Sequence, residues 1–241
     1  MNKFRLKFLI ERKTRRCLRE GRNQSLRSRW MPGLSQNFLF SLISVALMGT
    51  VVHGVYQLPN SSSLRTKIQA GEAIPDREVP VIAEARAMHL AALEELGKLK
   101  LNQQIKSYAL RFDINYRLSS LIYNISEDEN IDPELIYRII WTESRFKSDC
   151  IGPVGEIGLM QVRYGTALSI DPGATPRRLY DPAYNIRIGI KHLKDHLHFY
   201  RGDTRLALLA YNRGRGKVNE LVNLGVNPAN GYATKVLDSN F

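Results

Sequence analysis

Cysteine is scarce in this sequence, with only Cys17 and Cys150 among 241 residues. So few cysteines exclude a small fold held together by several disulfide bonds. Glycine and proline are also modest, at 17 and 10 residues, which excludes a collagen-like repeat. Hydrophobic residues make up 44% of the chain, too many for a chain that is disordered throughout. The composition is that of a globular protein.

Metal-binding patterns are also lacking. The five histidines have no cysteine or carboxylate partners at ligand spacing. His192 and His196 stand four residues apart, but the glutamate of a HExxH zinc motif does not accompany them. We therefore expect no metal and no cofactor.

Acidic residues are nearly absent from the first 36 positions, which hold 11 Lys+Arg but only Glu11 and Glu20. The remaining 205 residues hold 24 basic and 21 acidic side chains, so most of the net charge of +12 belongs to this arm. A nucleic-acid-binding protein is expected to carry its basic patch on a folded domain. We interpret residues 1–36 as a basic cytoplasmic arm that sets membrane topology, and we expect no nucleic-acid partner.

Charged residues are absent between Trp30 and Leu64, and the 21 residues from Phe38 to Leu58 are strongly apolar. As a helix, this segment is roughly 31 Å long, about the thickness of a bilayer core. We predict a transmembrane signal anchor over residues 37–58, with the amino terminus in the cytoplasm and the rest of the chain on the far side. The alternative is a cleaved signal peptide, but no small-x-small cleavage site follows the apolar run.

Residues 59–112 are predicted to form a linker and a stalk helix. Pro59, Pro75 and Pro80 indicate the linker. Between Val81 and about Arg111, apolar residues recur at intervals of three and four, which predicts a helix. The pattern fits either a coiled-coil stalk or a helix docked on the following domain.

Residues 113–241 are numerous enough for one small domain with its own core. Asp132, Asp181 and Asp203 each precede a segment with helical periodicity, and the first two are followed by proline, which favours the first position of a helix. No long segment alternates with the period of two that strands require. We predict an all-α domain.

Glu143 is the most unusual residue of this domain. It follows Ile136, Ile139 and Ile140 at helical spacing, so its carboxyl lies at the end of an apolar stripe. Burial raises the pKa of a carboxyl group, and a protonated carboxylic acid is the proton donor that cleavage of a glycosidic bond requires. The alternative is a buried ion pair with a nearby arginine such as Arg145.

Four short motifs accompany this glutamate: Glu143-Ser144, Gly158-Leu-Met-Gln161, Ala210-Tyr-Asn212 and Tyr232. With these motifs in this order, the chain from about 115 to 240 resembles the lytic transglycosylases of the soluble-lytic-transglycosylase type, which correspond to glycoside hydrolase family 23 and have a lysozyme-like helical fold. The chain departs from the family pattern at Gly155-Glu-Ile157 and at Arg213-Gly-Arg-Gly216. Arg213 and Arg215 either meet an anionic peptide stem or are solvated loop residues.

The resemblance implies that Glu143 is the catalytic residue. In the family scheme this acid protonates the oxygen between N-acetylmuramic acid (MurNAc) and N-acetylglucosamine (GlcNAc), then takes the proton of the C6 hydroxyl as a 1,6-anhydro ring closes. One carboxylate suffices for both steps. Ordinary glycosidases need two, but Asp149, Glu156 and Asp171 lie in predicted loops with nothing to fix them opposite Glu143.

The resemblance also implies substrate-binding roles for the other motif residues. Ser144 and Gln161 are expected to position the acid or the sugar, with helix or loop capping as the alternative. Met160 is expected to provide an apolar wall for a sugar face, and core packing is the alternative.

For the third and fourth motifs the resemblance implies three further substrate-binding residues. Tyr211 and Asn212 are expected to hold the substrate acetamido group, unless Tyr211 is simply a buried, hydrogen-bonded tyrosine. Tyr232 is expected to bond the catalytic carboxyl, and core packing is the alternative.

The resemblance and the predicted topology together imply a membrane-anchored enzyme that acts on peptidoglycan glycan strands. Its location is then the bacterial inner membrane, with the catalytic domain in the periplasm or cell-wall space. The alternatives are a lysozyme-like hydrolase (muramidase) and a non-catalytic peptidoglycan-binding scaffold. Partners in the cell-wall or secretion machinery are left open.

Overall fold

The computed structural model describes residues 79–238. These residues divide into two units, 79–102 and 103–238. The predicted basic arm, the membrane anchor and the proline-containing linker lie outside the described residues. Between residues 79 and 238, no helix is both long and apolar enough to cross a membrane.

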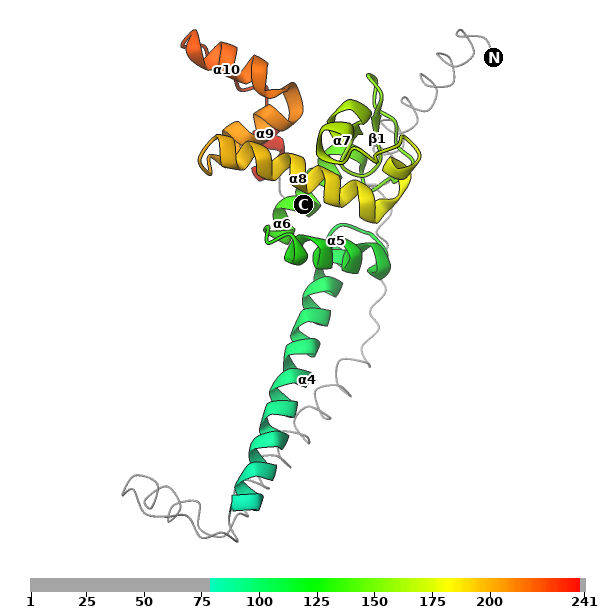
Figure 1. Cartoon of the computed structure of the whole chain (residues 1–241), viewed down its shortest axis with the longest axis vertical. Helices are drawn as coiled ribbons and strands as arrows, with labels where there is room; N and C mark the ends of the chain where they lie inside the picture. The colour runs from blue at the N-terminus through cyan, green and yellow to red at the C-terminus, as the bar shows by residue number, and fades with distance from the viewer. Residues whose placement is uncertain (1–78, 239–241) are drawn as a thin grey trace, which may run out of the picture. The chain divides into compact units, whose positions relative to one another are not determined.

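The helix predicted between Val81 and about Arg111 is present as α4, which runs from Val79 to Arg111 (Figure 1). Met88 and Leu99 in its first part are 68% and 53% exposed. From Gln103 onward the helix belongs to the second unit, where Ile105 and Tyr108 are buried. The compact domain therefore begins before the expected boundary at residue 113, because the last turns of α4 are part of its core.

The second unit is mainly helical, as the sequence predicts. In chain order its helices are α5 (Tyr116–Asp128), α6 (Pro133–Ser144), α7 (Tyr164–Ile170), the 3-10 helix η1 (Arg178–Tyr180), α8 (Pro182–Phe199), α9 (Thr204–Arg213), α10 (Arg215–Asn223) and α11 (Tyr232–Leu237).

The three predicted aspartate caps are confirmed. The carboxylates of Asp132, Asp181 and Asp203 accept hydrogen bonds from the first backbone N–H groups of α6, α8 and α9, at 3.0, 2.7 and 2.9 Å. Such bonds satisfy amide donors that have no partner inside the helix.

A short hairpin interrupts the helical architecture. Its strands β1 (Glu156–Ile157) and β2 (Val162–Arg163) pair in antiparallel fashion, with Glu156 opposite Arg163. The sequence does not predict this hairpin because strands of two residues are too short to show alternation. The domain is therefore mostly helical rather than purely helical.

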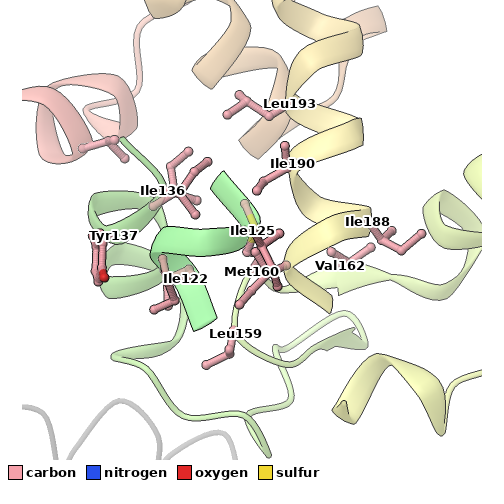
Figure 2. Packing of buried hydrophobic residues seen from close by; sticks show 14 of the residues in the cluster. Ile122, Ile125, Ile136, Tyr137, Leu159, Met160, Val162, Ile188, Ile190 and Leu193 are labelled. Atoms are coloured by element: carbon pink, nitrogen blue, oxygen red, sulfur yellow. The ribbon is translucent and has the colours of Figure 1, made fainter. Parts of the chain in front are cut away.

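The hydrophobic core lies around α8, which packs against α5, α7 and α9. Figure 2 shows α8 beside residues that come from α5, α6 and the hairpin region. The labelled members of this buried cluster are Ile122, Ile125, Ile136, Tyr137, Leu159, Met160, Val162, Ile188, Ile190 and Leu193.

Stacked aromatic rings hold the end of α4 in this core. The rings of Tyr108 and Phe112 stack on Tyr137 of α6, at centroid distances of 4.4 and 5.4 Å. The hydroxyl of Tyr137 donates to the carbonyl of Ser119 at 2.6 Å, so this buried polar group is satisfied. The stacked rings hold α6 against the end of α4, and α6 carries Glu143.

Candidate active site

Glu143 lies in the last turn of α6 and lines a cleft of about 990 Å³. The preceding Ile136, Ile139 and Ile140 are fully buried, as the apolar stripe predicts. The helix ends at Ser144 because Arg145 adopts a left-handed conformation with φ of 54°. The chain turns away there, and the carboxyl group remains at the border between core and cleft.

Tyr232, the first residue of α11, contacts this carboxyl group. Its hydroxyl donates a hydrogen bond to Oε1 of Glu143 at 2.6 Å. Tyr232 is only 8% exposed, and α11 packs against α6. The two side chains therefore meet in a largely desolvated place, where such a bond is strong.

Burial raises the pKa of Glu143 from 4.5 to about 7. The hydrogen bond from Tyr232 and the charge of Lys235 lower this pKa, whereas the charge of Glu156 raises it further. Desolvation is the dominant effect. At neutral pH the carboxyl group exists in comparable amounts as acid and as base, which suits a group that must both give and take a proton.

The ion-pair interpretation of Glu143 is not supported. The guanidinium of Arg145 lies over the ring of Trp141, 3.1 Å from its centroid. Within residues 79–238 no lysine or arginine forms an ion pair with Glu143, and Tyr232 is its hydrogen-bond donor. The carboxyl is therefore held by a neutral group.

The loop with the Gly-Leu-Met-Gln motif is held by Asn185 of α8. The side-chain carbonyl of Asn185 accepts from the backbone N–H of Met160 at 2.8 Å, and its amide donates to the carbonyls of Ile157 and Leu179 at 2.8 and 2.9 Å. Asn185 is 1% exposed. This buried asparagine fixes the backbone of the motif loop.

Met160 lies in the core rather than on the cleft wall. It is fully buried and does not line the cleft, and a Cβ atom at Gly189 would lie 2.5 Å from its sulfur. Met160 therefore packs in the core, which is the alternative to an apolar wall for a sugar face. Its backbone carbonyl nevertheless accepts a hydrogen bond from the Tyr211 hydroxyl at 2.8 Å, so it supports a residue that does line the cleft.

Ser144 also faces the protein interior. Its hydroxyl is bonded to the carbonyls of Leu159 and Ile140, at 2.8 and 3.2 Å, and the residue is 1% exposed. These contacts join the end of α6 to the motif loop. Ser144 therefore positions Glu143 through the backbone and does not reach the cleft.

Gln161 and Glu156 line the cleft together with Glu143. The amide of Gln161 donates to the carbonyls of Gly158 and Cys150, at 2.8 and 3.2 Å. Glu156 is fixed by Arg163, whose guanidinium lies 3.0 Å from its carboxylate across the hairpin. From the sequence alone, Glu156 belongs to a loop with nothing to fix it, whereas the β1–β2 hairpin and Arg163 hold it on the lining of the cleft that Glu143 also lines.

Tyr211 and Asn212 lie on α9 and both line the cleft. The ring of Tyr211 is 5.3 Å from that of His192. The exposed Asn212 accepts a hydrogen bond from the side chain of Asn230 at 2.9 Å, which leaves its own amide for other partners. Both positions suit contact with a bound sugar.

A group of charged and histidine side chains also lines this cleft. It consists of Lys191, His192, Asp195, His196, Arg213 and Arg215. The sequence gives the spacing of His192 and His196 on one helix but does not place them at Glu143. Within residues 79–238 no cluster of three or more side chains has the arrangement of a metal site.

Comparison with known proteins finds similarity to transglycosylases. Residues 120–226 match the family model of the Transglycosylase SLT domain. The chain is 39% identical over 94 residues to a transglycosylase of Enterobacteria phage PRD1, covering 39% of this chain and 34% of that protein. It is 32% identical over 115 residues to the soluble lytic murein transglycosylase of Escherichia coli K12, covering 45% of this chain and 17% of that protein.

Solved structures of soluble lytic transglycosylases also align with this chain. The enzyme from Pseudomonas aeruginosa has a TM-score of 0.44 and 26% identity, covering 55% of this chain and 22% of that one. The 70 kDa enzyme from Escherichia coli has a TM-score of 0.43 and 27% identity, covering 49% of this chain and 22% of that one. The chain spans about a third or less of the length of these relatives.

Proposed function

We propose that the chain, whose residues 120–226 match the model of the Transglycosylase SLT domain, is a peptidoglycan lytic transglycosylase. It cleaves the β-1,4 bond between MurNAc and GlcNAc without water and forms a 1,6-anhydro-MurNAc end. The observation that carries the proposal is Glu143, a carboxyl with a pKa of about 7 that is bonded to Tyr232 and lines a cleft.

Glu143 serves as acid and then as base. Its protonated form gives its proton to the glycosidic oxygen as the bond from C1 to that oxygen breaks. The acetamido carbonyl of the substrate stabilises the positive charge that develops at C1. The Glu143 carboxylate then takes the proton of the C6 hydroxyl, whose oxygen bonds to C1. One group suits both steps because its pKa lies near neutrality.

The motif residues divide into two groups by what they touch. Gln161, Tyr211 and Asn212 line the cleft and contact the sugars directly. Ser144 and Met160 support the cleft residues without lining the cleft. Ser144 holds the end of α6, and the backbone carbonyl of Met160 accepts a hydrogen bond from the hydroxyl of Tyr211. Tyr232 bonds the carboxylate form of Glu143 and so stabilises the state that follows the first proton transfer.

A second candidate function is that of a hydrolase, and Glu156 favours it. This carboxylate is fixed by Arg163 and lines the same cleft as Glu143, so it is a candidate for the base that activates water. Both oxygens of this carboxylate already accept hydrogen bonds, Oε1 from Arg163 and Oε2 from the backbone N–H of Val154, which opposes this role. We favour the transglycosylase because one carboxyl with a near-neutral pKa is sufficient for it.

Digestion of purified glycan strands, followed by mass spectrometry, separates the two functions. The transglycosylase product is lighter than the hydrolase product by one water. Glu156→Gln is expected to leave the anhydro product as the product formed, with Asp149→Asn, the same carboxylate-to-amide change outside the cleft lining, as the matched control. Products with a reducing MurNAc end, lost in Glu156→Gln, would instead establish the hydrolase. Absence of turnover by wild-type protein would support the binding scaffold.

We also propose that the apolar segment Phe38–Leu58 anchors the chain in the bacterial inner membrane, with the domain in the periplasm or cell-wall space. The support is the charge asymmetry of the sequence across this segment. A topology reporter fused after Phe241 is expected to be active only outside the cytoplasm. A mature amino terminus near Gly54 would show a cleaved signal peptide instead of an anchor.

A further inference from the structure

The cleft lining includes a group of cationic, histidine and acidic side chains that the proposed proton transfers do not use, here called the cationic wall. Lys191, His192, Asp195 and His196 lie on one face of α8. Arg213 ends α9 and Arg215 begins α10.

Gly214 links these two helices and has φ of 85°, a conformation that residues with a side chain rarely adopt. This turn brings Arg215 against α8.

A chain of hydrogen bonds runs from Arg215 through His196 to His192. The guanidinium of Arg215 pairs with Asp195, and its Nη2 and Nε lie 3.2 and 3.4 Å from Nδ1 of His196. A guanidinium only donates, so Nδ1 of His196 accepts and Nε2 carries the proton. Nε2 of His196 lies 3.2 Å from Nε2 of His192.

The direction of these bonds determines the tautomer of His192. Because Nε2 of His196 donates to Nε2 of His192, the remaining proton of His192 is on Nδ1. Burial lowers the pKa of both histidines, that of His196 to about 4, so both rings are neutral at pH 7. His192 is therefore a neutral side chain of the cleft wall with a donor on Nδ1.

Two cations of this wall lack an acidic partner among residues 79–238. Lys191 is exposed and forms no ion pair with a described residue. Arg213 donates to the carbonyl of Pro228 at 2.7 Å, which holds the side chain but leaves its charge uncompensated. Asp195, the one carboxylate of the group, already forms an ion pair with Arg215. The wall is therefore electropositive.

We propose that Lys191, His192 and Arg213 form a subsite for a carboxylate of the peptide stem carried by the glycan strand. This proposal rests on the proposed function. In a stem-bearing glycan strand the GlcNAc sugars are neutral and the lactyl carboxyl of MurNAc is bound in an amide to the peptide stem, so the stem carries the carboxylates. Cations give no advantage for neutral sugars, whereas a carboxylate gains charge-assisted hydrogen bonds. The Arg215–Asp195 pair and His196 position His192.

The test measures equilibrium binding, which does not require turnover. The ligands are soluble glycan strands whose peptide stems carry free carboxylates and the same strands with those carboxylates converted to amides. Wild-type protein is expected to bind the strands with free carboxylates at least about tenfold more tightly. Lys191→Gln and Arg213→Gln are each expected to reduce this preference severalfold, and the double variant is expected to abolish it. Lys194→Gln, on α8 but outside the cleft lining, is the matched control and retains the preference.

Several outcomes would overturn the subsite. They are the absence of a preference in wild-type protein, a preference unchanged in the double variant, and an equal loss in Lys194→Gln. Arg213→Lys keeps the charge and is expected to keep more of the preference than Arg213→Gln, which a merely structural role of Arg213 does not predict. Failure of the proposed function appears separately, as absence of an anhydro product from strands that still bind.

Discussion

The hydroxyl of Tyr232 lies 2.6 Å from Oε1 of Glu143, across 89 residues of sequence. The tyrosine begins a six-residue helix, α11, and the glutamate ends α6, so the packing of these two helices sets the distance. Burial raises the pKa of the glutamate, and the tyrosine limits that rise. The proton affinity of Glu143 is therefore a product of the fold and of one neutral partner.

Glu143→Gln is expected to lower kcat by roughly 10²–10⁴, because the amide keeps the size of the side chain but exchanges no proton. The domain is expected to fold, since glutamine leaves no buried charge. Release of anhydro products, followed by mass spectrometry, measures the activity, and thermal melting measures the fold. A variant that melts normally and retains the wild-type rate would remove Glu143 from the mechanism.

The pH dependence of stability gives a separate check on the same carboxyl group. Because the pKa is about 7 in the folded state and 4.5 is its ordinary value, the folded protein binds more protons between these pH values. The stability of wild-type protein therefore decreases through this window as pH rises, and Glu143→Gln lacks this contribution. The melting temperature of the variant relative to that of wild-type protein is expected to rise between about pH 4.5 and about pH 7. Above about pH 7 the difference is expected to stay level. A constant difference would contradict the raised pKa.

Tyr232→Phe removes the hydrogen bond that lowers the pKa of Glu143. The pKa is then expected to rise, so the alkaline limb of the kcat/KM profile moves to higher pH, because the acid remains protonated longer. Tyr184→Phe, whose hydroxyl bonds Asp171 outside the cleft lining, is the matched control and keeps the wild-type limb. A limb that stays in place in Tyr232→Phe would show that this bond does not tune the acid.

Asn185→Leu leaves the amide of Met160 and the carbonyls of Ile157 and Leu179 without their side-chain partner. Each buried unsatisfied group costs about 1–3 kcal/mol, so the loss of stability in urea unfolding is expected to exceed about 3 kcal/mol. Asn124→Leu on the exposed face of α5 is the control and should change stability by about 0.5 kcal/mol or less. Comparable losses in both variants would contradict the role of Asn185.

Gly189→Ala tests the contact between α8 and Met160. A Cβ atom there would lie 2.5 and 2.7 Å from the sulfur and Cβ of Met160, so overpacking of about 1–3 kcal/mol is expected to exceed the gain in helix propensity. Gly216→Ala in α10 meets no atom within 4 Å and should be neutral or stabilising by up to about 1 kcal/mol. Stabilisation of both variants would show that Met160 moves aside without cost.

Local patterns in the chain predict its elements well. Asp132, Asp181 and Asp203 cap the helices that follow them, and three isoleucines predict the buried face of α6. These features depend on residues within one or two helical turns, so the order of side chains along the chain is sufficient to predict them.

The assembly of the cleft depends on packing between distant segments. Met160 and Ser144 belong to the motifs yet face the core, whereas Glu156, from an apparent loop, is fixed in the cleft by its cross-strand partner Arg163. His192 and Arg213, from two different helices, both line the cleft. Local periodicity predicts a helix face, but only contacts between elements determine whether that face meets the core or a cleft, because burial and hydrogen bonding depend on neighbours that are remote in sequence.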